Sequence, residues 1–442
     1  PFFNKEACAA AAFALAEEKG IPIGKETIEK TVADIAYEPI VKKTPHFIDY
    51  LLDHSDQTVN RERKEDIFSS LDLELTNWLR ERLAYYVGRE ERNRIHNGSG
   101  LLLDNRTGEI LAYVGAYDVR DTEQGSMIDA VHIKNQPGSA IKPFLYALAI
   151  EEGFRPNTVL PDIPLTFGAE HMYEPLNFNN AFHGPVRLRV ALASSLNIPA
   201  VYTLNTVGIP RFEEFLIGLG FDSIREQRAG AGLGLALGNG EVTLFELTRA
   251  FSLFPRRGAP LTVTPVKRDA AAGSGQREEN GRFVSRYTAD IICDILQDDA
   301  SRFLGFRDNP VFDLGFPVMF KTGTADQFQN IWAVAATPDY TVGIWMGNVS
   351  GETVKGRTGS SLPARVAGEL LKKVQTRNSK FPVPYNAKEV TICTLSGMAP
   401  GPVCPGVRRE YLQQGEHLQQ CSFHYLRDGK MEIALPPLYD QW

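Results

Sequence analysis

The sequence has few cysteines, no excess of basic residues and no long apolar run. Its 442 residues include five cysteines, and 47 Lys and Arg against 54 Asp and Glu give a formal net charge of −7. A nucleic-acid-binding role therefore has no electrostatic support. Because no run of about 18 apolar residues occurs, we expect no membrane-spanning helix in this sequence.

The N-terminal stretch PFFNKEACAAAAFALAEEKG is rich in alanine but does not have the pattern of a signal peptide. Charged residues flank and interrupt it at Lys5, Glu6, Glu17 and Glu18, so a soluble helix explains it better. The chain begins at Pro1 without a methionine, and we expect it to be a fragment whose targeting signals were removed.

Length and patterning divide the chain into three expected regions. Residues 1–60 have helical spacing followed by a polar segment at 55–64. Residues 61–385 form the main region, interrupted by a polar surface loop at 268–282. Residues 386–442 contain Gly, Pro and Cys with little helical signal, which predicts a small β-rich module.

The main region predicts one antiparallel sheet covered by helices. Two apolar runs flank the turn cluster at 105–108 and predict a hairpin. Further strands are expected at 318–325, 330–338 and 340–348, and helices near 139–152, 186–196, 210–219, 241–254, 284–297 and 361–376. Because strands lie at both ends and helices between them, the fold class is α+β, with helices on both faces of the sheet.

The stretch PGSAIKPF, residues 137–144, contains a serine three residues before a lysine. Positions i and i+3 share one face of a helix, so the Lys142 amine is expected within proton-transfer reach of the Ser139 hydroxyl. Gly138 permits a tight entry, and Pro143 is tolerated in a first helical turn. A buried lysine beside a second cation has a lowered pKa and can act as the base for a serine nucleophile.

The second motif is Ser195-Leu196-Asn197, at the end of an expected helical stretch in ALASSLNIPA. Ser195 is a candidate to relay a proton to a leaving amine. Asn197 is a candidate to hold Lys142 or a substrate amide.

The third motif is Lys321-Thr322-Gly323, followed by Thr324, on an expected strand after FPVMF. Strand alternation places Lys321 and Gly323 on one face. Lys321 can then meet a substrate carboxylate and serve as the second cation, and Gly323 lets a peptide backbone lie close. Thr324 joins this face only if the strand twists at Gly323.

Each motif alone has a simpler explanation, namely a helix cap, a helix end or a strand end. Their occurrence together, in this order and on the expected elements, favours a catalytic site. His183 in NAFHGPV has no partner in the sequence pattern, and we expect a structural role for it.

With these motifs the chain resembles the class A penicillin-binding proteins, and within them the 1C subgroup. The resemblance extends from about residue 60 to the end. It is carried by IFSSLDLELTNWL, GLLLDNRTGEILAYVGAYD, NQPGSAIKPFLYALAIEEG, FHGPVRLRVALASSLNIPAVYTLNTVG, GLGLALGNGEVTLFELTRAFSLF, MFKTGTADQFQNIWAVAATPDYTVGIWMGN and LSGMAPGPVCPG.

The resemblance implies a serine D,D-transpeptidase that crosslinks peptidoglycan stem peptides at the periplasmic face of the inner membrane. It also implies covalent acylation by β-lactam antibiotics, partners among cell-wall synthesis proteins, and no catalytic cofactor. The residues it assigns to catalysis are Ser139, Lys142, Ser195, Asn197 and Lys321. Those it assigns to substrate binding are Thr322, Gly323 and Thr324.

On this resemblance, residues 1–60 are the linker and remnant of an upstream glycosyltransferase domain, 61–385 the transpeptidase domain, and 386–442 a C-terminal module. The glycosyltransferase signature, an acidic pair followed by an aromatic residue and a histidine, is not found, so we do not expect glycan polymerisation. The membrane anchor of the family is expected upstream of this chain.

Three cysteines and a histidine near the C-terminus, Cys393, Cys404, Cys421 and His424, have the spacing C-x10-C-x16-C-x2-H. The count and the short final spacing suit a structural zinc. Outside the membrane, however, cysteines usually pair, so one disulfide with one thiol left over is an alternative, as are three free thiols. Either crosslink would staple a module that has little core of its own.

Two other functions are compatible with the motifs. A D,D-carboxypeptidase or β-lactamase would use water as the acceptor, although no loop for the deacylating carboxylate of a β-lactamase is evident. A penicillin-binding scaffold in a wall-synthesis complex would keep the motifs without turnover.

Overall fold

The computed structural model describes residues 5–34, 43–54, 67–118, 127–168, 172–227, 232–267, 281–325, 329–440 and 442. The chain forms two compact units, Pro1–Ile48 and Asp49–Trp442, and each is described by itself. The expected polar segment 55–64 and nearly all of the loop 268–282 lie outside the described residues. The three-part division at residues 60 and 385 stays a prediction.

The first unit is helical, with α1 (Lys5–Glu18) and α2 (Lys25–Asp34). A small apolar set joins them, made of Ala9 and Ala16 from α1 and Ile28 and Val32 from α2. A third helix, α3 (Pro45–His54), spans the boundary between the two units in the sequence. No helix in the described ranges has both the length and the apolar character needed to cross a membrane.

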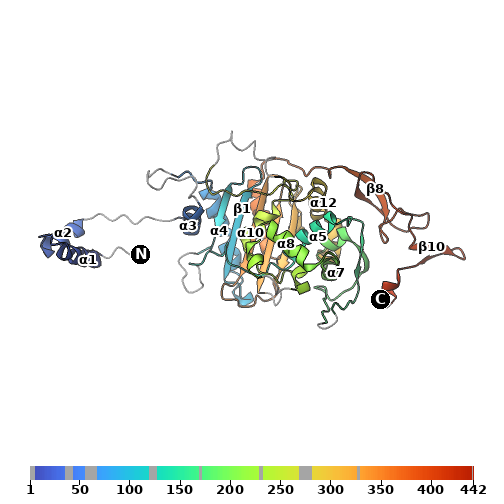
Figure 1. The fold of residues 1–442 in the computed structure, drawn as a ribbon, viewed down its shortest axis with the longest axis horizontal. Coiled ribbons are helices and arrows are strands. Elements are labelled where there is room, and N and C mark those ends of the chain that lie inside the picture. The colour runs from blue at the N-terminus through green and yellow to red at the C-terminus, as the bar shows by residue number, and fades with distance from the viewer. Residues whose placement is uncertain are drawn as a thin grey trace. The chain divides into compact units, whose positions relative to one another are not determined.

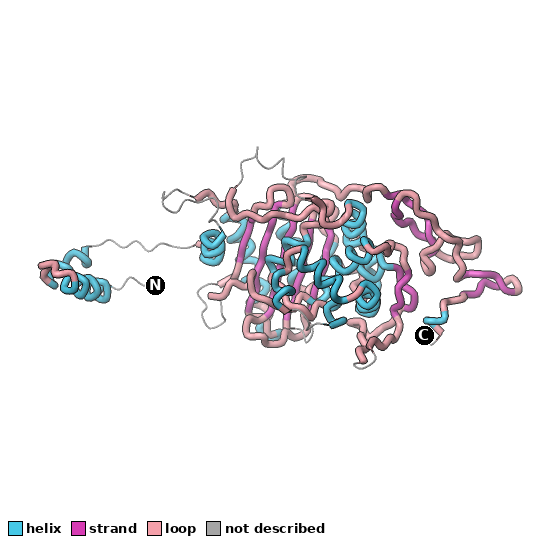
Figure 2. The backbone as a smooth tube through the Cα atoms, viewed as in Figure 1, coloured by secondary structure: helices cyan, strands magenta, loops and turns pink. Residues whose placement is uncertain are grey.

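The second unit is built around a five-stranded antiparallel sheet with the strand order β2-β1-β7-β6-β5 (Figure 2). The strands are β1 (Asn97–Asp104), β2 (Ile110–Val114), β5 (Met319–Thr324), β6 (Asn330–Ala336) and β7 (Tyr340–Gly347). The expected β1–β2 hairpin is present, and Asp104 Oδ1 accepts the Arg106 and Thr107 N–H groups of its turn. Strand β1 pairs with β7, which joins the two ends of the region, and β5 lies at the edge.

Helices cover both faces of this sheet, which confirms the expected α+β architecture (Figure 1). On one face, α4 (Leu73–Val87) and α14 (Pro363–Val374) pack through a buried cluster that includes Leu79, Leu83 and Leu370. On the other face, α10 (Leu244–Phe251) lies so close to β7 that a Cβ on Gly343 would come within 1.9 Å of Thr248 Oγ1. Asp72 precedes a run of apolar residues with helical spacing in the sequence, where a turn or helix cap is expected. It caps α4 by accepting the Leu75 N–H at 2.9 Å.

The second unit contains further helices. They are α5 (Lys142–Glu151), α6 (Leu188–Ala193), α7 (Asn197–Val207), α8 (Ile209–Gly218), α9 (Asp222–Glu226), α12 (Arg286–Gln297) and α13 (Phe303–Phe306). Every residue of α5 from Lys142 to Ile150 is buried. This helix therefore fixes the Ser139 turn, which precedes it, to the centre of the unit.

One local expectation from the sequence was wrong. Residues 67–71 resemble a short strand in sequence, but in the structure they make one isolated bridge, Ser69 to Val266. The second motif lies at the end of a helix as expected, because α6 ends at Ala193 and α7 begins at Asn197. Pro199 lies in the first turn of α7, where a proline costs no hydrogen bond.

The C-terminal part consists of two small hairpins, as its composition predicted. Strands β8 (Ala387–Cys393) and β9 (Val407–Gln413) pair, and so do β10 (His424–Arg427) and β11 (Lys430–Ile433) (Figure 2). A further pair, β3 (Val159–Asp162) with β4 (Gly184–Arg187), lies between α5 and α6 in the sequence.

Candidate active site

Ser139 lies in a short 3-10 helix, Gly138–Ile141, that runs directly into α5. A 3-10 helix has three residues per turn, so the side chains at i and i+3 lie above one another. Ser139 and Lys142 therefore lie on the same side of this helix. The backbone N–H of Lys142 donates to Ser139 O. Gly138 has φ 56°, and a Cβ there would lie 2.3 Å from Thr324 O. The entry to the turn thus requires glycine, both for its backbone conformation and because β5 passes so close.

The Lys142 amine is buried and surrounded by three acceptors from the second motif. It donates to Ser195 O at 2.8 Å, Leu196 O at 3.0 Å and Asn197 Oδ1 at 2.7 Å. Burial, and then the charge of Lys321, lower the pKa of Lys142 well below its usual range, and Asp162 acts in the opposite sense. The expected contact between Lys142 and Asn197 is therefore present.

The Ser139 hydroxyl is half-buried and, within the described ranges, has no hydrogen-bond partner. All three donors of a charged Lys142 are used by other groups. A neutral amine needs only two acceptors and has a free lone pair. Loss of one proton would therefore let Lys142 turn from its acceptors toward Ser139, and burial favours that neutral form.

Ser195 occupies the tight connection between α6 and α7. It has φ 59°, in the left-handed region that a serine rarely adopts. Its hydroxyl accepts a hydrogen bond from Lys321 Nζ at 2.8 Å, while its carbonyl accepts one from Lys142. The strained turn thus places the Ser195 hydroxyl and the Ser195 carbonyl between Lys321 and Lys142. Strained backbone conformations of this kind cluster at functional sites.

The buried Lys321 comes from β5 and also donates to Thr322 O at 2.9 Å. Burial, and then the charge of Arg302, lower the pKa of Lys321 to about 7. Lys142 and Lys321 are thus both held in the low-dielectric interior beside the serine turn, where the charge of Lys321 disfavours the charged form of Lys142.

Gly323 lies on the same side of β5 as Lys321, as strand alternation predicted. A Cβ at Gly323 would stand 2.0 Å from Pro137 O and 3.1 Å from the Ala140 Cβ. Glycine is thus needed at this position to admit the Ser139 turn itself, whereas the sequence suggested that it admits a substrate backbone.

Strand β5 leaves free backbone groups at the edge of the sheet. Ala325 N–H donates to Asn330 O on β6, and hydrogen-bonding residues alternate along an antiparallel strand. The Thr324 N–H therefore points to the free edge, beside Gly138. The Thr324 hydroxyl accepts a long hydrogen bond of 3.4 Å from the Gly359 N–H.

A buried polar network behind Asn197 was missed from the sequence. Asn177 accepts the Asn197 N–H at 2.8 Å and donates to Asp162 at 2.7 Å. His183 Nδ1 lies 2.5 Å from the other oxygen of Asp162, whose side chain is fully buried. His183 therefore has a partner after all, although nothing in the spacing of Asp162, Asn177 and Asn197 indicated that they meet.

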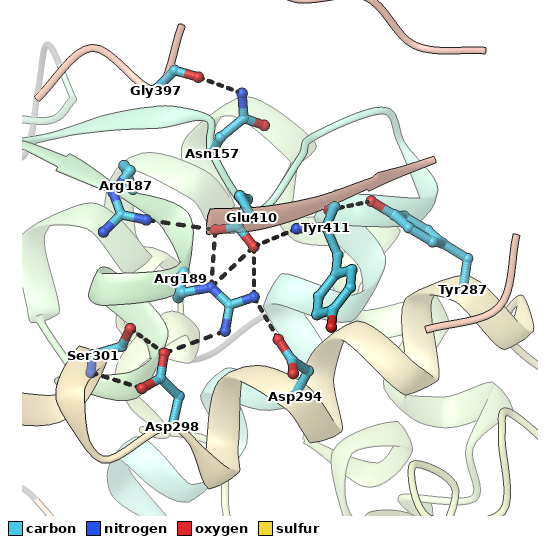
Figure 3. Close-up of polar contacts among 10 residues, drawn as sticks. All are labelled: Asn157, Arg187, Arg189, Tyr287, Asp294, Asp298, Ser301, Gly397, Glu410 and Tyr411. Atoms are coloured by element: carbon cyan, nitrogen blue, oxygen red, sulfur yellow. Dashed lines mark hydrogen bonds and ion pairs between the residues drawn. The ribbon is translucent and has the colours of Figure 1, made fainter. Parts of the chain in front are cut away.

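The helix before Ser195 is anchored by a cluster of buried and half-buried charges (Figure 3). Arg189 of α6 binds Glu410 of β9 at 2.5 Å, Asp294 at 2.5 Å and Asp298 at 3.4 Å. Arg187 also contacts Glu410, at 3.5 Å. Glu410 thus ties the C-terminal hairpin β8–β9 to the helix that ends at the Ser195 turn.

Residues 98–372 match the family model described as the penicillin binding protein transpeptidase domain. The chain belongs to this family. The match covers the sheet and all three motifs, so the resemblance inferred from the sequence is confirmed, and the chain fits the transpeptidase region of a class A penicillin-binding protein.

Curated relatives include penicillin-binding protein 1C of Escherichia coli, which is 28% identical over 360 residues, 77% of this chain and 43% of the relative. Penicillin-binding protein 1F of Bacillus subtilis is 29% identical over 318 residues, 70% of this chain and 42% of the relative. The chain thus spans less than half the length of these two relatives.

Solved structures share the fold. Penicillin-binding protein 1A from Haemophilus influenzae superposes with a TM-score of 0.72 at 18% identity, over 94% of this chain and 82% of that chain. PonA1 from Mycobacterium tuberculosis, solved in complex with penicillin V, gives 0.62 at 18% identity, over 77% of this chain and 94% of that chain.

Proposed function

We propose that this transpeptidase domain crosslinks peptidoglycan stem peptides as a D,D-transpeptidase, through an acyl-enzyme on Ser139. The observation that carries the proposal is the meeting of the three motifs at Ser195. Its carbonyl contacts Lys142, and its hydroxyl contacts Lys321. A serine beside a buried, easily deprotonated lysine is the arrangement that nucleophilic acyl transfer needs.

In the acylation step, Ser139 Oγ attacks the carbonyl carbon of the penultimate D-alanine. The serine proton passes to the neutral amine of Lys142. The oxyanion that forms lies where the N–H groups of Ser139 and Thr324 can donate to it, one from the serine turn and one from the free edge of β5. Collapse of this intermediate breaks the peptide bond, and the terminal D-alanine leaves after its nitrogen takes a proton, by way of Ser195, from the Lys142 ammonium.

Substrate binding is assigned to the edge of β5. Lys321, with Thr322, Gly323 and Thr324, would hold the donor peptide, and the terminal carboxylate would bind Lys321 and the Thr324 hydroxyl. Deacylation reverses the proton path, with Lys142 accepting a proton from the attacking amine of a second stem peptide. A β-lactam carries a carboxylate and a reactive amide and would acylate Ser139 in the same way.

The transpeptidases of this family need no cofactor, and the steps above use none. The family relation supports β-lactams and peptidoglycan as ligands, cell-wall synthesis proteins as partners, and the periplasmic face of the inner membrane as the place of action. The Cys/His cluster remote from these motifs in sequence is no part of this reaction.

The proposal is tested by incubating the protein with a stem-peptide donor ending in D-Ala-D-Ala and an added amine acceptor, followed by product analysis. Crosslinked product that is absent with Ser139→Ala supports it. Hydrolysed donor alone would indicate a carboxypeptidase. Penicillin labelling without either product would indicate a non-catalytic scaffold.

A further inference from the structure

The C-terminal cysteines and His424 come together around one point. The strands and loops that carry them are Cys393 at the end of β8, Cys404 in the loop to β9, Cys421 before β10, and His424 at the start of β10. One ligand atom from each of the four lies within 4.8 Å of every other. We propose that Cys393, Cys404, Cys421 and His424 bind one structural zinc ion.

The distances match a tetrahedral metal site. His424 Nδ1 lies 3.5 Å from Cys393 Sγ, 3.5 Å from Cys404 Sγ and 3.4 Å from Cys421 Sγ. With Zn–S bonds of about 2.3 Å and a Zn–N bond of about 2.0–2.1 Å at tetrahedral angles, each sulfur stands about 3.6 Å from the nitrogen. One imidazole nitrogen equidistant from three sulfurs is thus the arrangement that a Cys3His zinc ligand set requires.

Two of the sulfurs accept hydrogen bonds from neighbouring groups. The Gly401 N–H donates to Cys404 Sγ at 3.2 Å, and the Ser396 hydroxyl donates to Cys421 Sγ at 3.1 Å. Hydrogen bonds of this kind orient the ligands of a metal and stabilise their negative charge. Since three thiolates and a neutral imidazole fill four positions, the site is closed, which indicates a structural ion and not a catalytic one.

A disulfide explains less of this geometry. It would join two of the sulfurs, but it would not explain why the third sulfur and His424 lie at the same point. The three cysteines are unpaired here. Extracytoplasmic cysteines in general tend to form disulfides. The arrangement of all four groups in this chain is more specific evidence, and it favours a metal site.

The C-terminal module, residues 386–442, also needs a crosslink for stability. Besides Cys393, its buried apolar side chains in the described part of 386–442 are Ile392, Leu412, Phe423 and Tyr439. So small a core cannot hold two hairpins alone. The ion would tie β10 to the end of β8, and β8 pairs with β9, which carries Glu410. It would thereby keep in place the carboxylate that anchors Arg189.

The first measurement is the metal content of the tag-free chain after dialysis, by inductively coupled plasma mass spectrometry. We expect one zinc per chain, no zinc in His424→Ala, and full zinc in Cys293→Ala, a buried cysteine of α12 outside the cluster. His424→Cys should retain zinc on four thiolates. Retention in this variant would show that His424→Ala loses zinc because it lacks the ligand and not because it misfolds. Zinc-free wild type, or zinc retained in His424→Ala, would overturn the proposal.

The second measurement counts thiols by alkylation in denaturant with chelator and without reductant. Zinc predicts that all five cysteines of the chain react. A disulfide predicts that only three react, since five less two leaves three, and would overturn the proposal. Chelation should also lower the melting temperature of wild type but leave that of His424→Ala unchanged. Neither readout requires transpeptidase activity, so failure here is distinct from failure of the proposed reaction.

Discussion

Replacing Lys321 by alanine tests whether its ammonium group recognises the carboxylate of the ligand. A lysine ammonium has three N–H donors. Two are used within the protein, by Ser195 Oγ at 2.8 Å and by Thr322 O at 2.9 Å. One donor therefore remains for a carboxylate placed at the edge of β5.

A hydrogen bond between charged partners contributes about 1.5–3 kcal/mol, which corresponds to roughly 10–150-fold in rate if it is fully expressed in the transition state. Lys321→Ala should thus slow acylation by a β-lactam that bears the carboxylate by this factor more than acylation by an analogue that lacks it. Second-order acylation rate constants for such a matched pair measure the difference directly.

Ser195→Ala is the matched control for this experiment. It removes the hydrogen bond between the serine hydroxyl and Lys321 but keeps the positive charge. It should slow both β-lactams by a similar factor. If Lys321→Ala also slows both equally, Lys321 acts through Lys142 or through the fold, and carboxylate recognition is refuted.

Three further outcomes are expected. Because Lys321 has a pKa of about 7 and loses its charge as the pH rises, the pre-acylation affinity for carboxylate-bearing β-lactams should fall above that pH. The fall should disappear in Lys321→Ala, and stopped-flow titrations that show it unchanged would contradict the assignment. Lys142→Ala should slow acylation at least about 10²-fold, the usual loss for a positioned base, and a near wild-type rate would show that another group takes the proton. Glu410→Ala removes the buried carboxylate that Arg187 and Arg189 share, although Arg189 keeps its contacts with Asp294 and Asp298, and it should cost about 3–5 kcal/mol in urea denaturation. Glu410→Gln should cost less because its amide keeps hydrogen bonds, and a loss under about 1 kcal/mol for alanine would show that the pair is not desolvated.

The parts of the site that depend on local pattern could be predicted from the sequence. The spacing of Ser139 and Lys142 fixes a shared side of one turn, and strand alternation fixes the side shared by Lys321 and Gly323. The Asp72 cap and the β1–β2 hairpin follow from equally short-range signals. In each case the structural element itself brings the residues together, so no tertiary information is needed.

The parts that depend on distant contacts could not be predicted. Asn177 supports Asn197, and Glu410 supports Arg189 from 221 positions away in the chain. Nothing local marks either residue as a partner. Position 323 shows the same limit. Glycine is required there because Pro137 O lies too close for a Cβ, and this neighbour is present only in the folded chain.

The most direct test of the account is the site of penicillin attachment. After incubation with benzylpenicillin, peptide mass spectrometry should find one adduct per chain, on Ser139, and none in a folded Ser139→Ala variant. An adduct on any other residue, or labelling that persists in Ser139→Ala, would contradict the claim that this serine is the nucleophile on which the three motifs converge.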